Sequence, residues 1–438
     1  ILATAGSAVG LGNVWRFPYM TGENGGAAYI FIYIACVIVL GIPCMIAEFL
    51  IGRHGASNTA RAYTRLANGS KWKWIGYLEV LTGFLITGYY AVVSGWCLNY
   101  VYASIMGELK GDPNYVKDYF VAFSTDPIRP IFWTVAIFLI THYIIVHGVR
   151  NGIEKASKLM MPTLFILLLV IVVAACLLPG ASAGITFLLK PDFSKVTGDV
   201  FLNALGQCFY SMSIAMGCLC TYASYFNRKT NLTTSAIQIG FIDLFVAILA
   251  GLMIFPAAFS VGISPDSGPS LIFITLPNVF NQAFSGAPVL GWIIALLFYA
   301  LLSLAALTSL ISLHEVNTAF FYEELHISRK AGAWIVTLSC AVIGAVCSLS
   351  IGQKDTLSLF GKDLFDLFDF VTGQLMLPIG GMLMCVFVGW VVPQQIVKDE
   401  LTNWGTLRYH CYSAFVFSMR YVCPLGILAI MLHQFNLI

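Results

Sequence analysis

The chain has 438 residues, of which 59% are hydrophobic and 10% are charged, and its formal net charge is +2. Soluble domains carry about 25% charged residues, so the composition excludes a soluble protein, and the small net charge argues against a nucleic-acid partner. Apolar runs long enough to cross a lipid bilayer recur along the chain, so we expect an all-α polytopic membrane protein of about 11 transmembrane helices. The predicted spans lie near residues 1–22, 27–51, 75–106, 130–148, 156–178, 200–224, 234–262, 288–321, 332–352, 366–392 and 410–434.

The first predicted span, ILATAGSAVGLGNVWRFPY at residues 1–19, contains Gly6, Gly10 and Gly12 near its middle. Each glycine costs a helix about 1 kcal/mol relative to alanine, so we expect the helix to break there. A break inside the membrane leaves backbone N–H and C=O groups unpaired, which is tolerated only where they face protein, water or a ligand. We therefore interpret the break as a binding site.

The polarity of the two half-helices suggests what this site binds. The carbonyl end of the first half suits a cation, and the N–H groups of Leu11 and Gly12, which open the second half, suit an anion. A glycine-rich packing surface is the structural alternative. Asn13 and Arg16 argue against that alternative, because polar side chains close to a membrane break are costly unless they are used.

Three later spans also carry polar residues near their middle. The span at 200–224 contains QCFYSMSIAMG at 207–217, rich in small and hydroxylated residues, which predicts a second break. Two broken spans five helices apart fit inverted repeats, because an odd repeat length inverts the second copy and brings the breaks together at the midplane. Asp243 lies inside an apolar run and requires a partner. Thr308 and Ser309 either bind a cation or bond back to their own helix.

Basic residues predict the orientation of the chain. If the N-terminus is cytoplasmic, the loops on the cytoplasmic side contain more Lys and Arg residues than the loops on the outer side. The cytoplasmic loops then include Arg53, Arg61, Lys155, Arg228 and Arg329. By the positive-inside rule, the N-terminus is cytoplasmic. No cleavable signal peptide is visible, and residue 1 already lies in a span, so we expect a cytoplasmic tail to precede it. The 12 cysteines lie in or beside apolar spans without metal-ligand spacing, and we expect small core residues and no disulfide.

Several segments closely resemble the neurotransmitter:sodium symporter family, and its bacterial amino-acid transporter branch in particular. They are GSAVGLGNVWRFPY (6–19), GIPCMIAEFLIGR (41–53), GIEKASKLMMP (152–162), TYASYF (221–226), AALTSL (305–310) and LFDFVTG (367–373). The resemblance implies two inverted five-helix repeats, residues 1–178 and 200–392, with helices 1 and 6 broken, and a peripheral helix 11 at 410–438. The outer loop 107–129 lacks the cysteines and glycosylation sequon of animal relatives, which favours a bacterial cytoplasmic membrane.

The resemblance implies that an amino-acid carboxylate meets the N–H groups of Leu11 and Gly12 and the hydroxyl of Tyr90. Amine-transporting relatives place an aspartate where this chain has Gly10, which favours an amino acid. The rest of the implied pocket is uncharged and largely apolar, so we expect a neutral hydrophobic or aromatic substrate. The implied substrate residues are Ser7, Leu11, Gly12, Ile86, Tyr90, Tyr210, Ser211, Ser213, Met216, Ser309 and Leu313.

The resemblance also implies two sodium sites and two gates. The first sodium site comprises Ala8, Asn13, Ser211 and Asp243, completed by the substrate carboxylate. The second comprises the carbonyls of Gly6, Val9 and Ala305 with the hydroxyls of Thr308 and Ser309. The implied gate residues are Arg16 and Asp369 on the outer side and Tyr225 and Glu323 on the inner side.

The chain departs from the family pattern at several of these positions. The aromatic lid is Tyr210 rather than phenylalanine, and Ala215 replaces a glycine in the second break, which puts the extent of unwinding in question. Asp243 replaces the usual sodium-site asparagine, and Ala247 replaces a serine of chloride-dependent relatives. We infer that the fixed charge of Asp243 substitutes for chloride, so no chloride is expected.

The sequence thus predicts a sodium-coupled secondary symporter that imports an amino acid by alternating access. An enzyme is not expected, because the polar residues within the spans form no nucleophile–base pair. A proton-coupled amino-acid permease, or a non-transporting amino-acid sensor or channel on the same scaffold, remains an alternative. The sequence predicts no particular oligomeric state.

Overall fold

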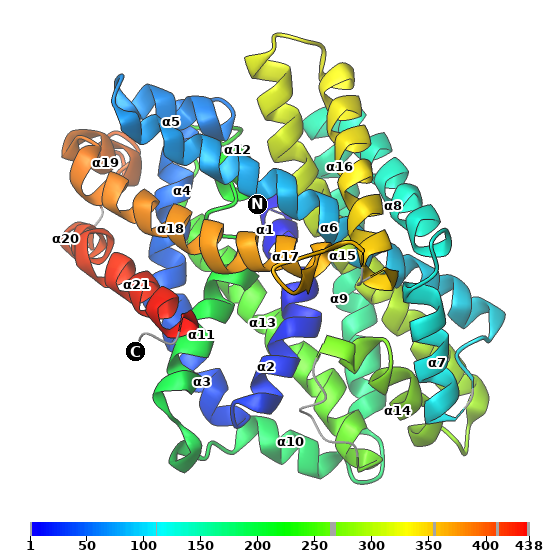
Figure 1. Ribbon diagram of the computed structural model, residues 1–438. Coiled ribbons are helices and arrows are strands. Elements are labelled where there is room, and N and C mark those ends of the chain that lie inside the picture. Colours follow the sequence, from blue (N-terminus) through cyan, green and yellow to red (C-terminus); the bar gives the residue numbers. More distant parts are fainter. Residues whose placement is uncertain (1, 111, 263–268, 354–355, 409–410, 436–438) are drawn as a thin grey trace.

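The computed structural model describes residues 2–110, 112–262, 269–353, 356–408 and 411–435. Residue 1, residue 410 and residues 436–438, which the predicted spans and repeat boundaries include, lie outside the described residues. Within the described chain, nine helical segments are long and apolar enough to cross a membrane. The two remaining predicted spans are interrupted helices (Figure 1). The prediction of an all-helical polytopic protein with two broken spans is therefore confirmed.

The α-helices are α1 (Leu2–Ala8), α2 (Phe17–Glu23), α3 (Ala27–Cys36), α4 (Ile42–Gly55), α5 (Thr59–Ala67), α6 (Trp74–Met106), α7 (Pro113–Ser124), α8 (Arg129–Val146), α9 (Glu154–Cys176), α10 (Ala181–Leu189), α11 (Gly198–Ser211), α12 (Cys218–Ala223), α13 (Leu232–Ser260), α14 (Thr275–Ala283), α15 (Pro288–Glu324), α16 (Arg329–Gly352), α17 (Leu364–Phe370), α18 (Leu377–Val386), α19 (Gln394–Leu401), α20 (Tyr412–Phe417) and α21 (Cys423–Gln434). Two short antiparallel strands, β1 (Ser358–Leu359) and β2 (Lys362–Asp363), form a hairpin before α17.

Wider π-helical turns connect several of these helices into continuous spans. They occupy Gly12–Arg16, Val37–Gly41, Val149–Ile153, Val371–Met376, Phe387–Val391 and Ser418–Val422. In four spans a proline is the second residue after the π turn, at Pro18, Pro43, Pro378 and Pro424. Proline has no N–H to donate to the preceding turn, and a π turn is one way for the helix to absorb the missing bond. The prolines thus account for the position of these four π turns.

The longest helices form a scaffold beside the broken spans. The helices α6 and α15 pack against each other and against α8 and α16, and α1 packs on α15 and α9. In Figure 1, α5 and the turn between α15 and α16 lie at the top of the molecule, whereas α10 and α14 lie at the bottom.

A buried ion pair fastens the end of α4 to α19. The Arg53 Nε atom lies 2.6 Å from Glu400 Oε2, and the two side chains are only 2% and 1% exposed. Arg53 Nη1 also donates to the carbonyl of Thr230, 2.6 Å away. The Trp404 ring lies against two guanidinium groups, 5.4 Å from that of Arg53 and 4.9 Å from that of Arg228. We call Arg53, Glu400 and Trp404 the α4–α19 clasp.

Candidate substrate and ion site

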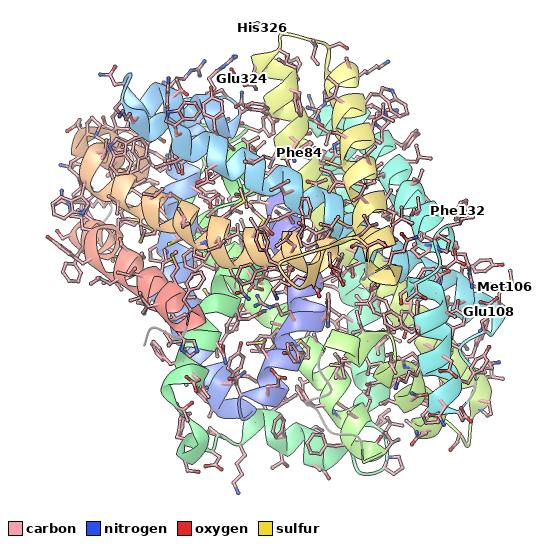
Figure 2. All side chains as sticks on the ribbon, in the orientation of Figure 1. Phe84, Met106, Glu108, Phe132, Glu324 and His326 are labelled. Atoms are coloured by element: carbon pink, nitrogen blue, oxygen red, sulfur yellow. The ribbon has the colours of Figure 1, made fainter. Side chains whose placement is uncertain are left out.

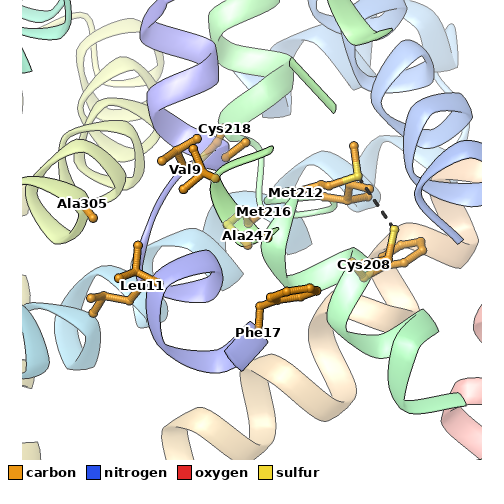
Figure 3. Packing of buried hydrophobic residues seen from close by; sticks show 14 of the residues in the cluster. Val9, Leu11, Phe17, Cys208, Met212, Met216, Cys218, Ala247 and Ala305 are labelled. Carbon is orange, nitrogen blue, oxygen red and sulfur yellow. Dashed lines mark hydrogen bonds between the residues drawn. The ribbon is translucent and has the colours of Figure 1, made fainter. Parts of the chain in front are cut away.

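The first span is interrupted directly after Ala8. Val9 and Gly10 are not helical, and the chain resumes in the π turn that begins at Gly12. The Gly10 N–H donates to Asn13 Oδ1 at 3.1 Å instead of to a helical carbonyl. Figure 3 shows Val9 and Leu11 on the thin connection between the two coiled halves. The break therefore exposes backbone groups at the place that the glycines predict.

The second interruption lies between α11 and α12, at residues 212–217. Its backbone turns through positive φ angles at Ser213 (54°), Ala215 (65°) and Gly217 (75°). A residue with a Cβ atom adopts this conformation at a cost of about 1–2 kcal/mol. Ala215 therefore does not prevent the unwinding. Its N–H donates to Glu48 Oε1 at 2.5 Å, which stabilises the strained turn.

Glu48 belongs to no predicted site, although it is fully buried and orders the second break. The sequence carries a signal for this role, because a carboxylate within an apolar run must find a donor. The identity of that donor, a main-chain N–H group, is not encoded in any local pattern. The methyl group of Ala215 faces Gly380 and Gly381 of α18, where added Cβ atoms would lie 3.6 and 3.5 Å from it, in van der Waals contact. The unwound segment is thus held from two sides.

Gly217 gives a direct test of this geometry. An alanine there would have to adopt a φ of +75°, and its Cβ atom would lie 3.1 Å from both Thr59 Oγ1 and Val316 Cγ1. We expect Gly217→Ala to reduce the free energy of unfolding by about 2–4 kcal/mol, through backbone strain and overpacking. Gly69→Ala is the matched control, since φ is +84° and no described atom lies within 4 Å of the added Cβ. Thermal unfolding curves measure both, and equal losses would contradict the packing argument.

The two breaks face each other across a small cavity. Ser213 Oγ donates to the Ser7 carbonyl at 3.0 Å, and Gln207 Nε2 donates to the Gly12 carbonyl at 3.0 Å. The cavity has a volume of about 40 Å³, a few times the 10–15 Å³ or so that one water molecule needs. A larger ligand therefore enters only when side chains move. The cavity is lined by Ser7, Ala8, Gly10, Leu11, Gly12, Ile86, Tyr90, Tyr210, Ser211, Ser213, Met216, Ser309 and Leu313.

All the residues predicted to bind the substrate line this cavity, together with Ala8 and Gly10. The Leu11 N–H donates a hydrogen bond to the Tyr90 hydroxyl oxygen, 3.5 Å away, so the two groups lie side by side at the start of the second half-helix. Ile86, Met216 and Leu313 supply apolar surface. The arrangement thus offers hydrogen-bond donors for an anionic group beside an apolar pocket.

A wider vestibule of about 270 Å³ shares Leu11, Tyr90 and Tyr210 with the small cavity. The predicted outer gate residues Arg16 and Asp369 both line this vestibule. Among the described residues, however, no ion pair joins them. The Arg16 guanidinium lies over the Tyr210 ring at 4.4 Å, and Asp369 Oδ1 accepts a hydrogen bond from the Tyr89 hydroxyl at 3.2 Å.

The predicted first sodium site gathers around Asp243 of α13. Its Oδ1 accepts hydrogen bonds from Asn13 Nδ2 at 2.7 Å and Ser211 Oγ at 2.9 Å, and its Oδ2 accepts one from the Tyr33 hydroxyl at 3.1 Å. Asn13 thus turns its Nδ2 toward Asp243, whereas a cation requires Oδ1. A half turn of the amide would exchange the two atoms. Ala8 lies at the end of α1, on the lining of the adjacent cavity.

The predicted second sodium site lies between α1 and α15. Thr308 Oγ1 is 3.2 Å from the Val9 carbonyl oxygen and 2.9 Å from that of Ala305, and Gly6 packs directly against Thr308. Ser309 points elsewhere, because its Oγ occupies the space beside Gly10 in which a Cβ would clash. The structure therefore brings carbonyl and hydroxyl oxygens together here, with Ser309 directed to the cavity.

The predicted inner gate residue Glu323, at the end of α15, binds the start of α5. Its Oε2 accepts hydrogen bonds from the N–H and the Nδ2 of Asn58, at 2.8 and 2.9 Å. Arg61 Nε lies 3.0 Å from Glu324 Oε1 (Figure 2, top). Asn58 also caps α5 by accepting from the Arg61 N–H. The sequence predicts that Asn58 caps the helix, but it does not predict that Asn58 contacts the gate residue Glu323.

The other predicted inner gate residue, Tyr225, has a different partner from Glu323. Its hydroxyl donates to Glu315 Oε1 at 2.8 Å, and Glu315 also forms an ion pair with Arg329 at the start of α16. Glu315 is fully buried. The two predicted inner gate residues therefore belong to separate polar clusters, one at Glu323 and one at Glu315.

These features define a class of protein. Two broken membrane helices that present backbone groups and a carboxylate to a cavity near mid-span form the binding site of a secondary transporter. The sequence matches the Sodium:neurotransmitter symporter family over residues 1–112 and 115–437. The chain belongs to this family, which consists of transporters and not of enzymes.

Individual relatives agree with the family. An uncharacterized sodium-dependent transporter of Haemophilus influenzae is 36% identical over 99% of this chain and 96% of the relative. One of Bacillus subtilis is 34% identical over 100% of this chain and 96% of the relative. The crystal structure of MhsT in complex with L-phenylalanine superimposes with a TM-score of 0.88 at 38% identity, covering 98% of this chain and 97% of MhsT. The family resemblance predicted from the sequence is thus confirmed.

Proposed function

We propose that this sodium-dependent transporter imports a neutral hydrophobic or aromatic amino acid by alternating access, without chloride. The main observation behind this proposal is the small cavity between the two breaks. There the Tyr90 hydroxyl and the Leu11 N–H lie together, beside the apolar side chains of Ile86, Met216 and Leu313. The first pair would hold the carboxylate, and the apolar residues would hold the side chain. The L-phenylalanine bound to MhsT, a protein 38% identical to this chain, supports this substrate class.

Two sodium ions would drive the uptake. One would bind at Asn13, Ser211 and Asp243 with the Ala8 carbonyl and the substrate carboxylate. The other would bind the oxygens of Gly6, Val9, Ala305, Thr308 and Ser309. Each ion gains about 2.3 kcal/mol from a 100 mV potential and about 1.4 kcal/mol from a tenfold gradient, so two supply on the order of 7 kcal/mol.

The same proposal includes the setting of the transporter. The N-terminus and α5, which carries Arg61 and Arg65, would face the cytoplasm of a bacterium, with the chain in the cytoplasmic membrane. Residues 1–178 and 200–392 would form the two inverted repeats, and residues 410–438 a peripheral helix. Arg16 and Asp369 would close the outer side after the substrate enters, while Tyr225 and Glu323 would release their partners on the inner side.

The function is tested with the full chain in proteoliposomes. We expect concentrative uptake of one or a few of the twenty amino acids when external sodium exceeds internal sodium, and loss of uptake when choline replaces sodium at constant pH. Uptake in choline driven by a pH gradient would instead identify a proton-coupled permease. Binding of an amino acid without concentrative uptake would identify a sensor or channel.

A matched pair of variants tests the second sodium site. Thr308→Val removes a hydroxyl that faces the Val9 carbonyl. We expect the sodium concentration for half-maximal substrate binding to rise about tenfold or more, because the ion loses one of its oxygen ligands; a tenfold change corresponds to about 1.4 kcal/mol. Thr141→Val is the control, because that buried hydroxyl bonds only to the Ile137 carbonyl of its own helix, at 2.8 Å. An unchanged sodium dependence in Thr308→Val would contradict the assignment.

A further inference from the structure

Three thiols from distant parts of the sequence meet inside the protein. Cys44 of α4, Cys385 of α18 and Cys423 of α21 have Sγ atoms that all lie within 4.8 Å of one another, and the Cys44 and Cys385 sulfurs are 3.5 Å apart. All three side chains are fully buried. We call these residues the three-thiol cluster. The predicted transport mechanism uses none of them.

The spacing of the cluster fits one metal ion. Three sulfurs that surround an ion at about 2.3 Å lie about 4 Å from one another. The Cys44 and Cys385 sulfurs are 3.5 Å apart and no pair in the cluster exceeds 4.8 Å, so small shifts would reach this geometry. A ligand set of sulfur alone selects soft ions such as Cu(I). Zinc prefers four ligands, and the cluster offers three sulfurs.

A nearby hydroxyl can stabilise a thiolate in the cluster. Ser418 Oγ lies 3.2 Å from Cys423 Sγ, within reach to donate its hydrogen bond there instead of to the Val39 carbonyl, which is 3.5 Å away. Ser418 lies in the π turn that precedes α21, so the turn places donor and thiol on the same side of the span. The loss of thiol protons to the solvent would accompany metal binding, and this donor would favour the charged sulfur that results.

Further sulfur atoms extend from the cluster toward the second break. Gly41, one turn before Cys44, leaves room for the sulfurs of Cys208 and Met212, which lie 3.8 Å apart (Figure 3). An added Cβ at Gly41 would lie 2.9 Å from Cys208 Sγ. Met212 is the first residue of the unwound segment. An ion in the cluster would therefore hold α4, α18 and α21 together close to a moving part of the transporter.

We propose that Cys44, Cys385 and Cys423 form a trigonal binding site for Cu(I). The site is separate from the substrate cavity, and its existence does not depend on which substrate is transported. The ion would bridge three helices that come from three different parts of the chain. It would thereby stabilise one arrangement of α4 relative to α18 and α21.

The test is a titration of the reduced, full-length protein in detergent with Cu(I), in competition with the chromogenic chelator bicinchoninate. We expect one Cu(I) per chain, and loss of this ion at the same chelator concentration in Cys44→Ser and Cys385→Ser. Cys347→Ser, which removes a buried thiol from α16, should retain it. Equal binding by all the variants would overturn the proposal, as would stronger binding of Zn(II) than of Cu(I).

X-ray absorption of the copper complex gives a second measurement. Three sulfur donors in the first shell support the site, and a nitrogen or oxygen donor or fewer sulfurs overturns it. If the cysteine variants fail to fold, Ser418→Ala decides, because it keeps all three thiols. We expect a Cu(I) affinity about tenfold lower in that variant, the usual cost of removing a group that orients a ligand. An unchanged affinity would overturn the proposal.

Discussion

Gly10→Ala is expected to reduce amino-acid binding about 10- to 100-fold and to reduce sodium-driven uptake in proportion. The added methyl group would clash with Ser309 Oγ and would lie 3.4 Å from the Tyr90 hydroxyl. Overpacking of this kind costs about 1–3 kcal/mol. Here the cost falls on the place where we propose that the substrate carboxylate approaches the backbone. Equilibrium binding of radiolabelled amino acid, with and without sodium, measures the effect.

Gly373→Ala is the matched control for this prediction. Gly373 lines the vestibule, and no described atom lies within 4 Å of a Cβ added there. Both variants add one methyl group to a membrane span, so a general effect of the methyl group on the helix would appear in both. If Gly10→Ala binds the amino acid as tightly as Gly373→Ala does, the carboxylate does not bind beside Gly10.

Asp243→Asn is expected to make uptake chloride-sensitive, whereas the unmodified protein should transport equally well when gluconate replaces chloride. The carboxylate accepts hydrogen bonds from Asn13, Ser211 and Tyr33, and it is fully buried. Hydrogen bonds to a charged group contribute about 1.5–3 kcal/mol, so uptake of the variant in gluconate should fall about tenfold or more. Chloride should restore part of it, because the freed donors can bind an anion.

Asp118→Asn provides the control for loss of one negative charge, because Asp118 is exposed on α7. Its uptake should be the same in chloride and gluconate. Initial rates of uptake in proteoliposomes with matched internal buffers measure both variants. Strict chloride dependence of the unmodified protein would refute the role proposed for Asp243, as would an Asp243→Asn variant whose uptake in gluconate equals that of the unmodified protein.

The fold is largely predictable because each span carries its own signal. Apolar length identifies the continuous spans, and Gly6, Gly10 and Gly12 identify the first break. The second break was harder to predict, because Ala215 lacks the freedom of glycine. Its stability depends on the contact with Glu48, which is 167 residues away in the chain. The helix propensities of neighbouring residues carry no information about such a distant partner.

The sequence predicts which residues lie at the candidate site, but not which of their side chains contact one another. The substrate residues inferred from the family resemblance lie around one cavity, since the order of the motifs along the chain determines which helices meet. The partners of Arg16 and Tyr225 were not predictable, because they depend on side-chain rotamers in this particular conformation. The three-thiol cluster was missed for a related reason. Cys44 and Cys385 are 341 residues apart, and the spacing rules for metal ligands cover only neighbours in sequence.

The α4–α19 clasp has a consequence for shortened versions of the protein. Glu400 of α19 neutralises the charge of Arg53 in α4, which belongs to the second predicted span. Truncation before α19 would strand Arg53 in a medium of low polarity, at a cost of about 3–5 kcal/mol. Through this ion pair, a helix near the C-terminus contributes to the stability of the N-terminal half of the chain.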